Sequence, residues 1–343
     1  MKNDLLPVTI LTGFLGAGKT TLINHLLTQE TTEKILIIEN EFGPINIDSC
    51  LLPTASNIEI MEMTNGCICC SVQGELTTAL HQLNQKRLNG TLSFDRLIIE
   101  TTGLADPAPI LQTFFIDELI RNTFELDGVV TLIDGEHILQ QLAQHRVVRS
   151  QIGFADRLIL TKSDRLTEQQ LHTVLSRLQL INNKAILFVA VNGEIAKAHW
   201  LDIHAFQLSE ELTINKGFFI IANPNQQIAN YQPIMHTSST ISPHDDIYSY
   251  LFEAGCVDIK KVGQFVERLI EIHGNDMLRY KGILAIKDNP AKLIVQGVHK
   301  VVGFDYGKAW QDDEQQRSQL VIISRKLPFD RLMQEFLATE IKD

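Results

Sequence analysis

The sequence of 343 residues has no apolar run that approaches the roughly 20 residues a membrane-spanning helix requires. Its short apolar stretch near the N-terminus runs directly into a glycine-rich loop, which is typical of a strand and not of a signal peptide. The sequence also lacks a basic excess, because 41 acidic and 30 basic residues give a formal net charge of -11. This charge opposes binding to nucleic acid or to an anionic membrane. We therefore expect a soluble protein with neither of these partners.

Cysteine is scarce, and its count of five is odd. Three of the five, Cys67, Cys69 and Cys70, lie within four positions, a spacing unsuited to a framework of long-range disulfides. Reduced thiols and a cytoplasmic location fit this pattern better. The 11 histidines form no H-x-H or H-x-x-x-H pair, so we assign none of them as a metal ligand.

Short β-branched runs alternate with longer helical patterns through the first two-thirds of the chain. Continuous apolar runs of this kind are typical of strands that are buried on both faces of a parallel sheet. We expect crossover helices at 19–29, 72–86 and 166–180. The expected strands are 8–12, 34–39, 58–63, 96–101, 128–134, 157–162 and 185–191. The pattern predicts an α/β fold with a doubly wound, mostly parallel sheet that binds its ligands beyond the carboxyl ends of the strands.

The composition shifts to Asn, Gln, Ser, Pro and His over residues 223–246. Prolines interrupt regular structure there, so we expect a linker between a P-loop domain over 1–222 and a smaller domain over 247–343. In the smaller domain, a helix that starts after Asp258 precedes consecutive strand-like runs, and a last helix starts from Pro328. Strands without intervening helices predict a small α+β domain.

A glycine-rich loop, GFLGAGKT at residues 13–20, has the pattern G-x-x-x-x-G-K-T and lies between the first strand and the first helix. Its glycines allow the backbone N–H groups to turn toward phosphates at the positive end of that helix. Lys19 is expected to reach the β- and γ-phosphates, and Thr20 to ligate Mg2+. The pattern predicts the phosphate loop of a nucleoside-triphosphate hydrolase. The loop residues that we expect at the phosphates are Gly13, Gly16, Ala17 and Gly18.

A second carboxylate near the metal is required in a P-loop enzyme, usually at the end of a neighbouring strand. The strand at 96–101 ends in Glu100-Thr101-Thr102-Gly103. We interpret Glu100 as the acid on the Mg2+ side, which together with Lys19 and Thr20 forms the predicted catalytic group. Gly103 is interpreted as a backbone donor that senses the γ-phosphate. The alternative is a helix N-cap at one of the two threonines.

The segment Thr161-Lys162-Ser163-Asp164 follows another predicted strand and has the spacing of the guanine-reading T/N-K-x-D motif. The Asp164 carboxylate can accept from both the ring N1–H and the exocyclic amine of guanine, whereas adenine offers no such pair of donors. The segment therefore predicts GTP as the nucleotide. If the match is incidental, the chain is a P-loop kinase or ATPase that prefers ATP.

The three clustered cysteines follow a predicted strand and precede a predicted helix, where a helix N-terminus favours the thiolate. Thiolates combined with oxygen or nitrogen ligands suit Zn2+, with copper(I) as the alternative. Two or three thiolates leave a tetrahedron incomplete, so Glu39 and Glu41, at the end of the second strand, are our candidates for the remaining ligand. The competing interpretation is that the cysteines are small core side chains or form a strained disulfide.

Five motifs resemble, in their order, those of the CobW-type P-loop GTPases, a family of metallochaperone GTPases, and in particular its YjiA-like group. Segments at 279–284 and 295–299 resemble the C-terminal domain of the same family. The chain lacks the histidine-rich stretch of many members, which argues against bulk metal storage. The five motifs are GFLGAGKTT, ENEFG at 39–43, NGCICC at 65–70, ETTGLADP at 100–107 and TKSD.

This resemblance implies a GTPase that binds Zn2+ or another divalent metal and couples its nucleotide state to metal delivery to a client metalloprotein. By position in the family's motifs, Thr21 joins the phosphate site, and Lys162 joins Asp164 at the guanine. Asp48 falls in an expected switch segment that approaches Mg2+, and Asn192 is expected to touch the base. The alternative function is a zinc-responsive GTP switch that recruits a partner without metal transfer. A homo-oligomer is compatible with either function.

Overall fold

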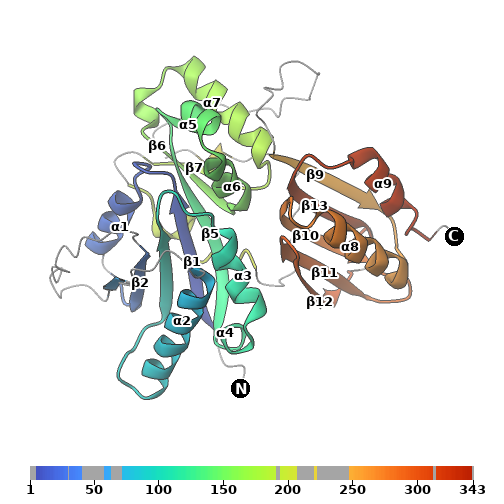
Figure 1. Cartoon of the computed structure of the whole chain (residues 1–343), viewed down its shortest axis with the longest axis horizontal. Coiled ribbons are helices and arrows are strands. Elements are labelled where there is room, and N and C mark those ends of the chain that lie inside the picture. Colours follow the sequence, from blue (N-terminus) through green and yellow to red (C-terminus); the bar gives the residue numbers. More distant parts are fainter. Residues whose placement is uncertain are drawn as a thin grey trace. The chain divides into compact units, whose positions relative to one another are not determined.

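The computed structural model describes residues 5–29, 31–40, 58–62, 72–190, 194–206, 220–221, 247–311 and 314–341. The chain divides into two compact units (Figure 1). The first is built mainly from residues up to 207, and the second mainly from residues after 233. Each unit has its own sheet.

The first unit is organised on an eight-stranded sheet with the order β3-β2-β4-β1-β5-β6-β7-β8. All of its strand pairs are parallel. From β1 the chain passes to β2 and β3 at one edge, returns to β4 beside β1, and then continues through β5 to β8 toward the other edge. The predicted doubly wound parallel sheet is therefore confirmed. Its strands are β1 (Leu6–Gly13), β2 (Ile35–Asn40), β3 (Ile58–Glu62), β4 (Arg96–Thr101), β5 (Phe124–Asp134), β6 (Arg157–Thr161), β7 (Ile186–Val189) and β8 (Ile220–Ile221).

Helices connect the strands of this sheet, and α1 packs on one face through Leu22, Ile23 and Leu26. The predicted helices at 19–29, 72–86 and 166–180 correspond to α1, α2 and α7. Four shorter helices between β4 and β6 were not predicted, because α3 is apolar on nearly all sides and the others are too short to show a helical period. The helices are α1 (Lys19–Thr28), α2 (Val72–Leu88), α3 (Ala108–Ile116), α4 (Glu118–Arg121), α5 (Ile138–Gln144), α6 (Arg146–Phe154) and α7 (Glu168–Ile181).

The second unit contains a five-stranded antiparallel sheet with the order β12-β11-β10-β13-β9. Phe265 of α8 and Phe336 of α9 pack with Phe252 of β9 in its core. The start of α8 is confirmed, since the Asp258 carboxylate accepts from the backbone N–H groups of Lys260 and Lys261. The α+β prediction is also confirmed. The elements are β9 (Ile247–Ala254), α8 (Ile259–His273), β10 (Met277–Ala285), β11 (Ala291–Val298), β12 (Val301–Ala309), β13 (Ser318–Arg325) and α9 (Phe329–Leu337).

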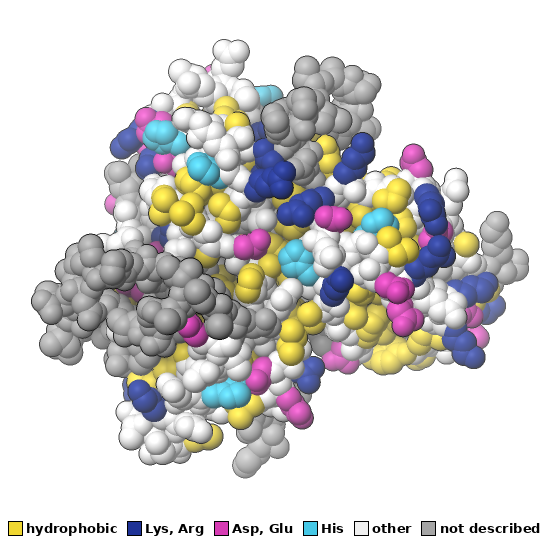
Figure 2. Space-filling view, in the orientation of Figure 1, with side chains coloured by type: hydrophobic (Ala, Val, Ile, Leu, Met, Phe, Trp, Pro, Cys, Tyr) yellow, Lys and Arg dark blue, Asp and Glu magenta, His cyan; other side chains and the backbone are white. Residues whose placement is uncertain are grey.

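No helix among the described residues combines the length and the apolar character needed to cross a membrane. Acidic and basic side chains are both present on the face of the molecule that Figure 2 presents, and neither sign covers it.

Candidate nucleotide and metal site

The phosphate loop connects the end of β1 to the start of α1. Gly13, Gly16 and Gly18 have φ angles of 142°, 74° and 100°, in the region that favours glycine. A Cβ on Gly13 would also lie 2.6 Å from the carbonyl oxygen of Leu132 on β5. Gly18 occupies the N-cap position of α1, which receives no side-chain cap. The start of α1 is therefore a position at which an anion is electrostatically favoured.

Lys19 and the two threonines that follow it form the first turn of α1. The Lys19 ammonium donates to the carbonyl oxygen of Gly13 at 2.9 Å, so it folds back over the loop. Thr20 and Thr21 are exposed at the helix start, whereas Ala17 is buried beneath the loop. This arrangement places one cation and two hydroxyl groups around the helix terminus, as a phosphate and Mg2+ site requires.

Glu100 is a register neighbour of Leu11 on β1 and of Glu39 on β2. Side chains alternate along a strand, so Glu39 and Glu100 lie on the same face as Ile37 and Ile98, two positions earlier. Both isoleucines belong to the core cluster that includes the buried side chains of α1. Glu39 and Glu100 therefore occupy the α1 face of the sheet at its carboxyl edge.

On β3, the backbone of Glu62 is the register neighbour of Glu39. The sequence reasoning did not select Glu62, although the predicted strand at 58–63 places an acid at its carboxyl end. Carboxylate oxygens such as those of Glu39 and Glu100 are ligands that Mg2+ prefers and that Zn2+ accepts. Glu39 and Glu100 form the acid row of the candidate site.

Gly103 lies directly against the phosphate loop. A Cβ on Gly103 would be 2.6 Å from the backbone nitrogen of Leu15. The Gln151 amide fixes the segment by donating to the carbonyl oxygens of Gly103 and Ala105, both at 3.1 Å. The next helix, α3, begins only at Ala108, so the alternative of a helix cap at the two threonines after Glu100 is wrong.

The predicted guanine-reading segment also contacts the phosphate loop. The Thr161 hydroxyl, at the end of β6, lies within donating distance of the carbonyl oxygens of Ala17 (2.9 Å) and Ile133 (3.1 Å). Lys162 has a φ of 55°, which non-glycine residues rarely adopt. Asp164 follows on an exposed 3-10 turn over Ser163–Arg165.

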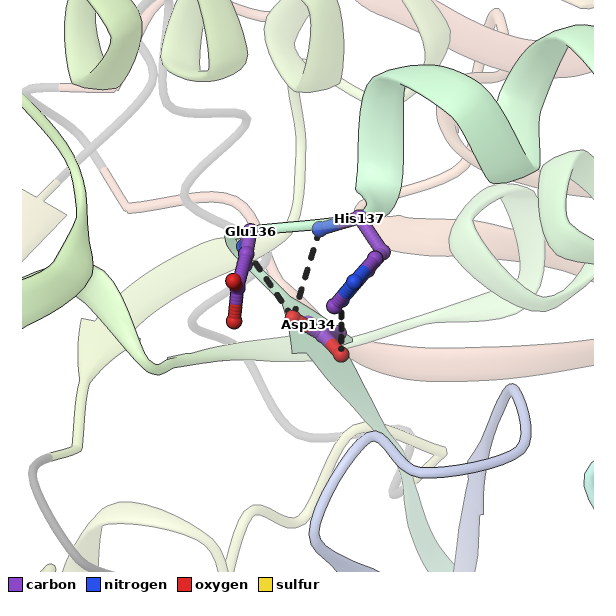
Figure 3. Close-up of side chains that lie close together, drawn as sticks. All are labelled: Asp134, Glu136 and His137. Atoms are coloured by element: carbon purple, nitrogen blue, oxygen red, sulfur yellow. Dashed lines mark hydrogen bonds and ion pairs between the residues drawn. The ribbon is translucent and has the colours of Figure 1, made fainter.

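Asp134 is a member of the site that the sequence reasoning missed. Its carboxylate, at the end of β5 and only 3% exposed, accepts from the Lys162 ammonium at 2.7 Å. Glu136 and His137 lie on either side of it, and one potential ligand atom of each of the three residues lies within 4.8 Å of the others (Figure 3). Burial opposes ionisation of Asp134, but hydrogen bonds from Lys162 and His137 outweigh it and lower the pKa of Asp134. The sequence does contain a signal for Asp134, because this aspartate ends the predicted strand at 128–134.

Several predicted ligands lie outside the described residues. The described chain on either side of the cysteine segment ends at Glu62 on β3 and resumes at Val72 on α2. The predictions for these residues stay predictions. They are Glu41, Asp48, Cys67, Cys69, Cys70 and Asn192.

Comparison with known sequences identifies the family. The family profile of the CobW/HypB/UreG nucleotide-binding domain matches residues 7–189, and that of the CobW C-terminal domain matches residues 249–340. The chain belongs to the CobW family. A curated relative, the zinc chaperone YjiA of Escherichia coli K12, is 38% identical over 96% of this chain and 98% of its own length. The zinc chaperone CobW of Pseudomonas aeruginosa is 33% identical over 94% of this chain and 88% of its own length.

A solved structure of a family member has the same fold. The crystal structure of the Zn(II)-bound YjiA GTPase from E. coli superposes with a TM-score of 0.76 at 33% identity. The match covers 98% of this chain and 99% of the other. The match therefore extends over both units of this chain.

Proposed function

We propose that this CobW-family protein is a GTPase that couples its nucleotide state to the binding of Zn2+, or a related divalent metal, and to its delivery to a client protein. One observation supports the proposal. The phosphate loop lies at the same edge of the sheet as Gly103, the guanine-reading segment, and the acid row of Glu39 and Glu100. The relatives named as zinc chaperones support the choice of metal.

The nucleotide half of the proposal assigns each group a task. Lys19 and the N–H groups of the loop bind the phosphates, and Thr20 with Glu100 holds Mg2+. When bound, Mg2+ neutralises the charge that develops on the phosphate oxygens during hydrolysis. Gly103 presents its backbone N–H toward the terminal phosphate, and Asp164 with Lys162 selects guanine. We add Thr21, Asp48 and Asn192 from the family's motifs, as residues that complete the phosphate, Mg2+ and base contacts.

The metal half of the proposal rests on Glu39. Its position beside Glu100 gives a Zn2+ ligand and an Mg2+-side acid on adjacent strands, so a shift of either one is transmitted to the other. Cys67, Cys69 and Cys70 supply the thiolates, with Glu41 as a further oxygen ligand. Because thiolates must stay reduced, we place the protein in the cytoplasm.

Two further expectations belong to this proposal. We retain the domain limits 1–222 and 247–343, with a linker at 223–246; the two family profiles end and begin at 189 and 249, on either side of that linker. The net charge of -11 opposes nucleic acid and an anionic membrane as partners, so the proposed partners are a nucleotide, a metal ion and a client protein. Self-association into a homo-oligomer is compatible with these partners.

The decisive experiment measures zinc affinity with a non-hydrolysable GTP analogue and with GDP. Coupling predicts affinities that differ by roughly 5-fold or more between the two nucleotide states. Cys67→Ser is expected to remove most of the zinc affinity. The matched control is Cys256→Ser, since Cys256 is a half-buried free cysteine of the second unit. Equal affinities in both states, or full zinc binding by Cys67→Ser, would refute the coupling.

A metal-transfer assay with a client protein distinguishes the zinc chaperone from the zinc-responsive GTP switch. A chaperone metallates its apo client with GTP and releases less metal with the non-hydrolysable analogue. A zinc-responsive switch binds its partner in the GTP state and transfers no metal with either nucleotide.

A further inference from the structure

Two turns at the carboxyl edge of the sheet are joined by three contacts. The turn after β5 spans residues 134–137, and the turn after β6 spans residues 161–165 and contains the predicted guanine-reading segment 161–164. The Gly135 N–H donates to the carbonyl oxygen of Thr161 at 3.0 Å, and a Cβ on Gly135 would lie 2.9 Å from that oxygen. The other two contacts are ion pairs, Asp134 with Lys162 at 2.7 Å and Glu136 with Arg165 at 2.9 Å.

Of the two ion pairs, the one at Asp134 is shielded from water. The Asp134 side chain is 3% exposed and that of Lys162 is 29% exposed, whereas both members of the Glu136–Arg165 pair are more than a third exposed. Shielding strengthens a hydrogen-bonded ion pair, and exposure weakens it. Lys162 also has the φ of 55°, an unfavourable backbone conformation that its surroundings must maintain.

The two carboxylate oxygens of Asp134 have different partners. Oδ1 accepts from the backbone N–H groups of Glu136 (3.0 Å) and His137 (3.3 Å) and so shapes the turn. Oδ2 accepts from the Lys162 ammonium and from Nδ1 of His137. The first oxygen therefore serves the local backbone, and the second orients side chains.

We propose that Asp134 is a positioning residue for guanine recognition: its Oδ2 fixes the Lys162 ammonium at the end of β5, so that Lys162 and Asp164 meet the base in a preset arrangement. This inference rests on the proposed function, because it requires the 161–164 segment to bind guanine. A metal ion held by Asp134, Glu136 and His137 is the competing role for the cluster. It is disfavoured because both carboxylates already have cationic partners in Lys162 and Arg165.

Asp134→Asn is the sharpest test, because the amide oxygen can replace Oδ1 in the turn while the acceptor for Lys162 is lost. GDP affinity and the KM for GTP are expected to weaken by roughly 10- to 100-fold, the usual effect of losing a hydrogen bond to a charged group. The preference for GTP over ATP should fall with them, and kcat at saturating GTP should change by less than about 3-fold. Glu136→Ala, which removes the exposed ion pair, is the matched control and should change GDP affinity by less than about 5-fold.

A double-mutant cycle with Lys162→Met distinguishes positioning from a general effect on folding. In the Lys162→Met background, Asp134→Asn is expected to weaken GDP binding by no more than about 2-fold, because the group that it positions is gone. An additive effect would overturn the inference. So would loss of one bound zinc ion on Asp134→Asn with unchanged nucleotide affinity, since the cluster would then be a metal site.

A second variant keeps the inference testable if Asp134→Asn does not fold. Asp134→Glu retains the charge but moves the carboxylate by one methylene, and it should also lower the preference for GTP. An unchanged preference would contradict the inference while leaving the guanine site intact. If the unmodified protein bound ATP as tightly as GTP, the guanine assignment in the proposed function would fail instead.

Discussion

Glu39 and Glu100 are register neighbours on the adjacent parallel strands β2 and β4, on the face of the sheet that α1 covers. Glu39 is the described candidate for the Zn2+ site, and Glu100 is the candidate for the Mg2+ side of the nucleotide. The two candidate ligands thus lie on neighbouring strands, the shortest lateral separation that a sheet offers.

Replacing Glu100 and Glu39 one at a time should separate GTP hydrolysis from zinc binding. Glu100→Gln is expected to lower kcat for GTP hydrolysis by on the order of 100-fold, as does loss of a group that stabilises transition-state charge. Its zinc affinity without nucleotide should stay within about 3-fold of the unmodified protein. Glu39→Gln should show the reverse pattern, with zinc affinity reduced by about 10-fold or more. Metal competition and phosphate-release assays measure both, and an equal loss of hydrolysis in both variants would refute the division.

The contact between Thr161 and Ala17 ties the guanine-reading segment to the phosphate loop. Thr161→Val keeps the shape of the side chain but leaves a buried carbonyl oxygen without its donor, which should cost about 1–3 kcal/mol of unfolding free energy. GTP affinity should fall as well, because the loop loses its anchor. Thr101→Val is the control, since the Thr101 hydroxyl is also buried and donates to Thr12 at 2.8 Å. It should lower the unfolding free energy in denaturant titrations with less effect on GTP affinity.

The close approach of Gly103 to Leu15 leaves no room for a side chain. An added Cβ in Gly103→Ala would lie 2.6 Å from the backbone nitrogen of Leu15 in the phosphate loop, so one of the two segments must move. GTP hydrolysis should then fall by about 10-fold or more, and by a larger factor than GDP affinity. Gly263→Ala is the control, because a Cβ there has nothing within 4 Å and alanine favours the α8 helix by about 0.5–1 kcal/mol. Unchanged hydrolysis in Gly103→Ala would show that this segment does not sense the terminal phosphate.

The sequence predicted the parallel sheet and the phosphate loop because both leave local signals, an apolar run and a glycine pattern. It missed β9 and β12, the two edge strands of the second sheet, because polar residues in β9 and glycines and polar residues in β12 interrupt their apolar runs. It missed Asp134 for a different reason. The partner of Asp134 is Lys162, 28 positions away, and only the parallel register of β5 and β6 brings their ends together.

A carboxylate at Asp117 gives a pH-dependent contribution to stability. The backbone N–H of Ile120 donates to this N-cap of α4 and lowers the pKa of Asp117; burial opposes this effect, and His81 adds to it. The folded-state pKa lies below the ordinary value of 3.8, so the stabilisation is complete above that value and is lost as the pH falls through the folded-state pKa. Asp117→Ala should cost about 1 kcal/mol at pH 7. In urea titrations that difference should narrow below about pH 4; a constant difference down to pH 2 would contradict the assignment.

Arg96 is a buried cation that joins three acids at the start of β4. Its side chain is 2% exposed and pairs with Glu33 at 3.0 Å, with the buried Asp127 at 3.4 Å, and with Asp202. Removing one partner of a buried pair leaves an uncompensated charge, so Arg96→Met should cost about 3–5 kcal/mol of unfolding free energy. Arg165→Met is the control in the same unit, because its ion pair is exposed and should contribute less than about 1 kcal/mol. Adding Asp127→Asn to Arg96→Met should recover part of the lost unfolding free energy, as measured by denaturant titration. If it does not, the loss arises from the missing packing of the arginine side chain and not from the unpaired charge of Asp127.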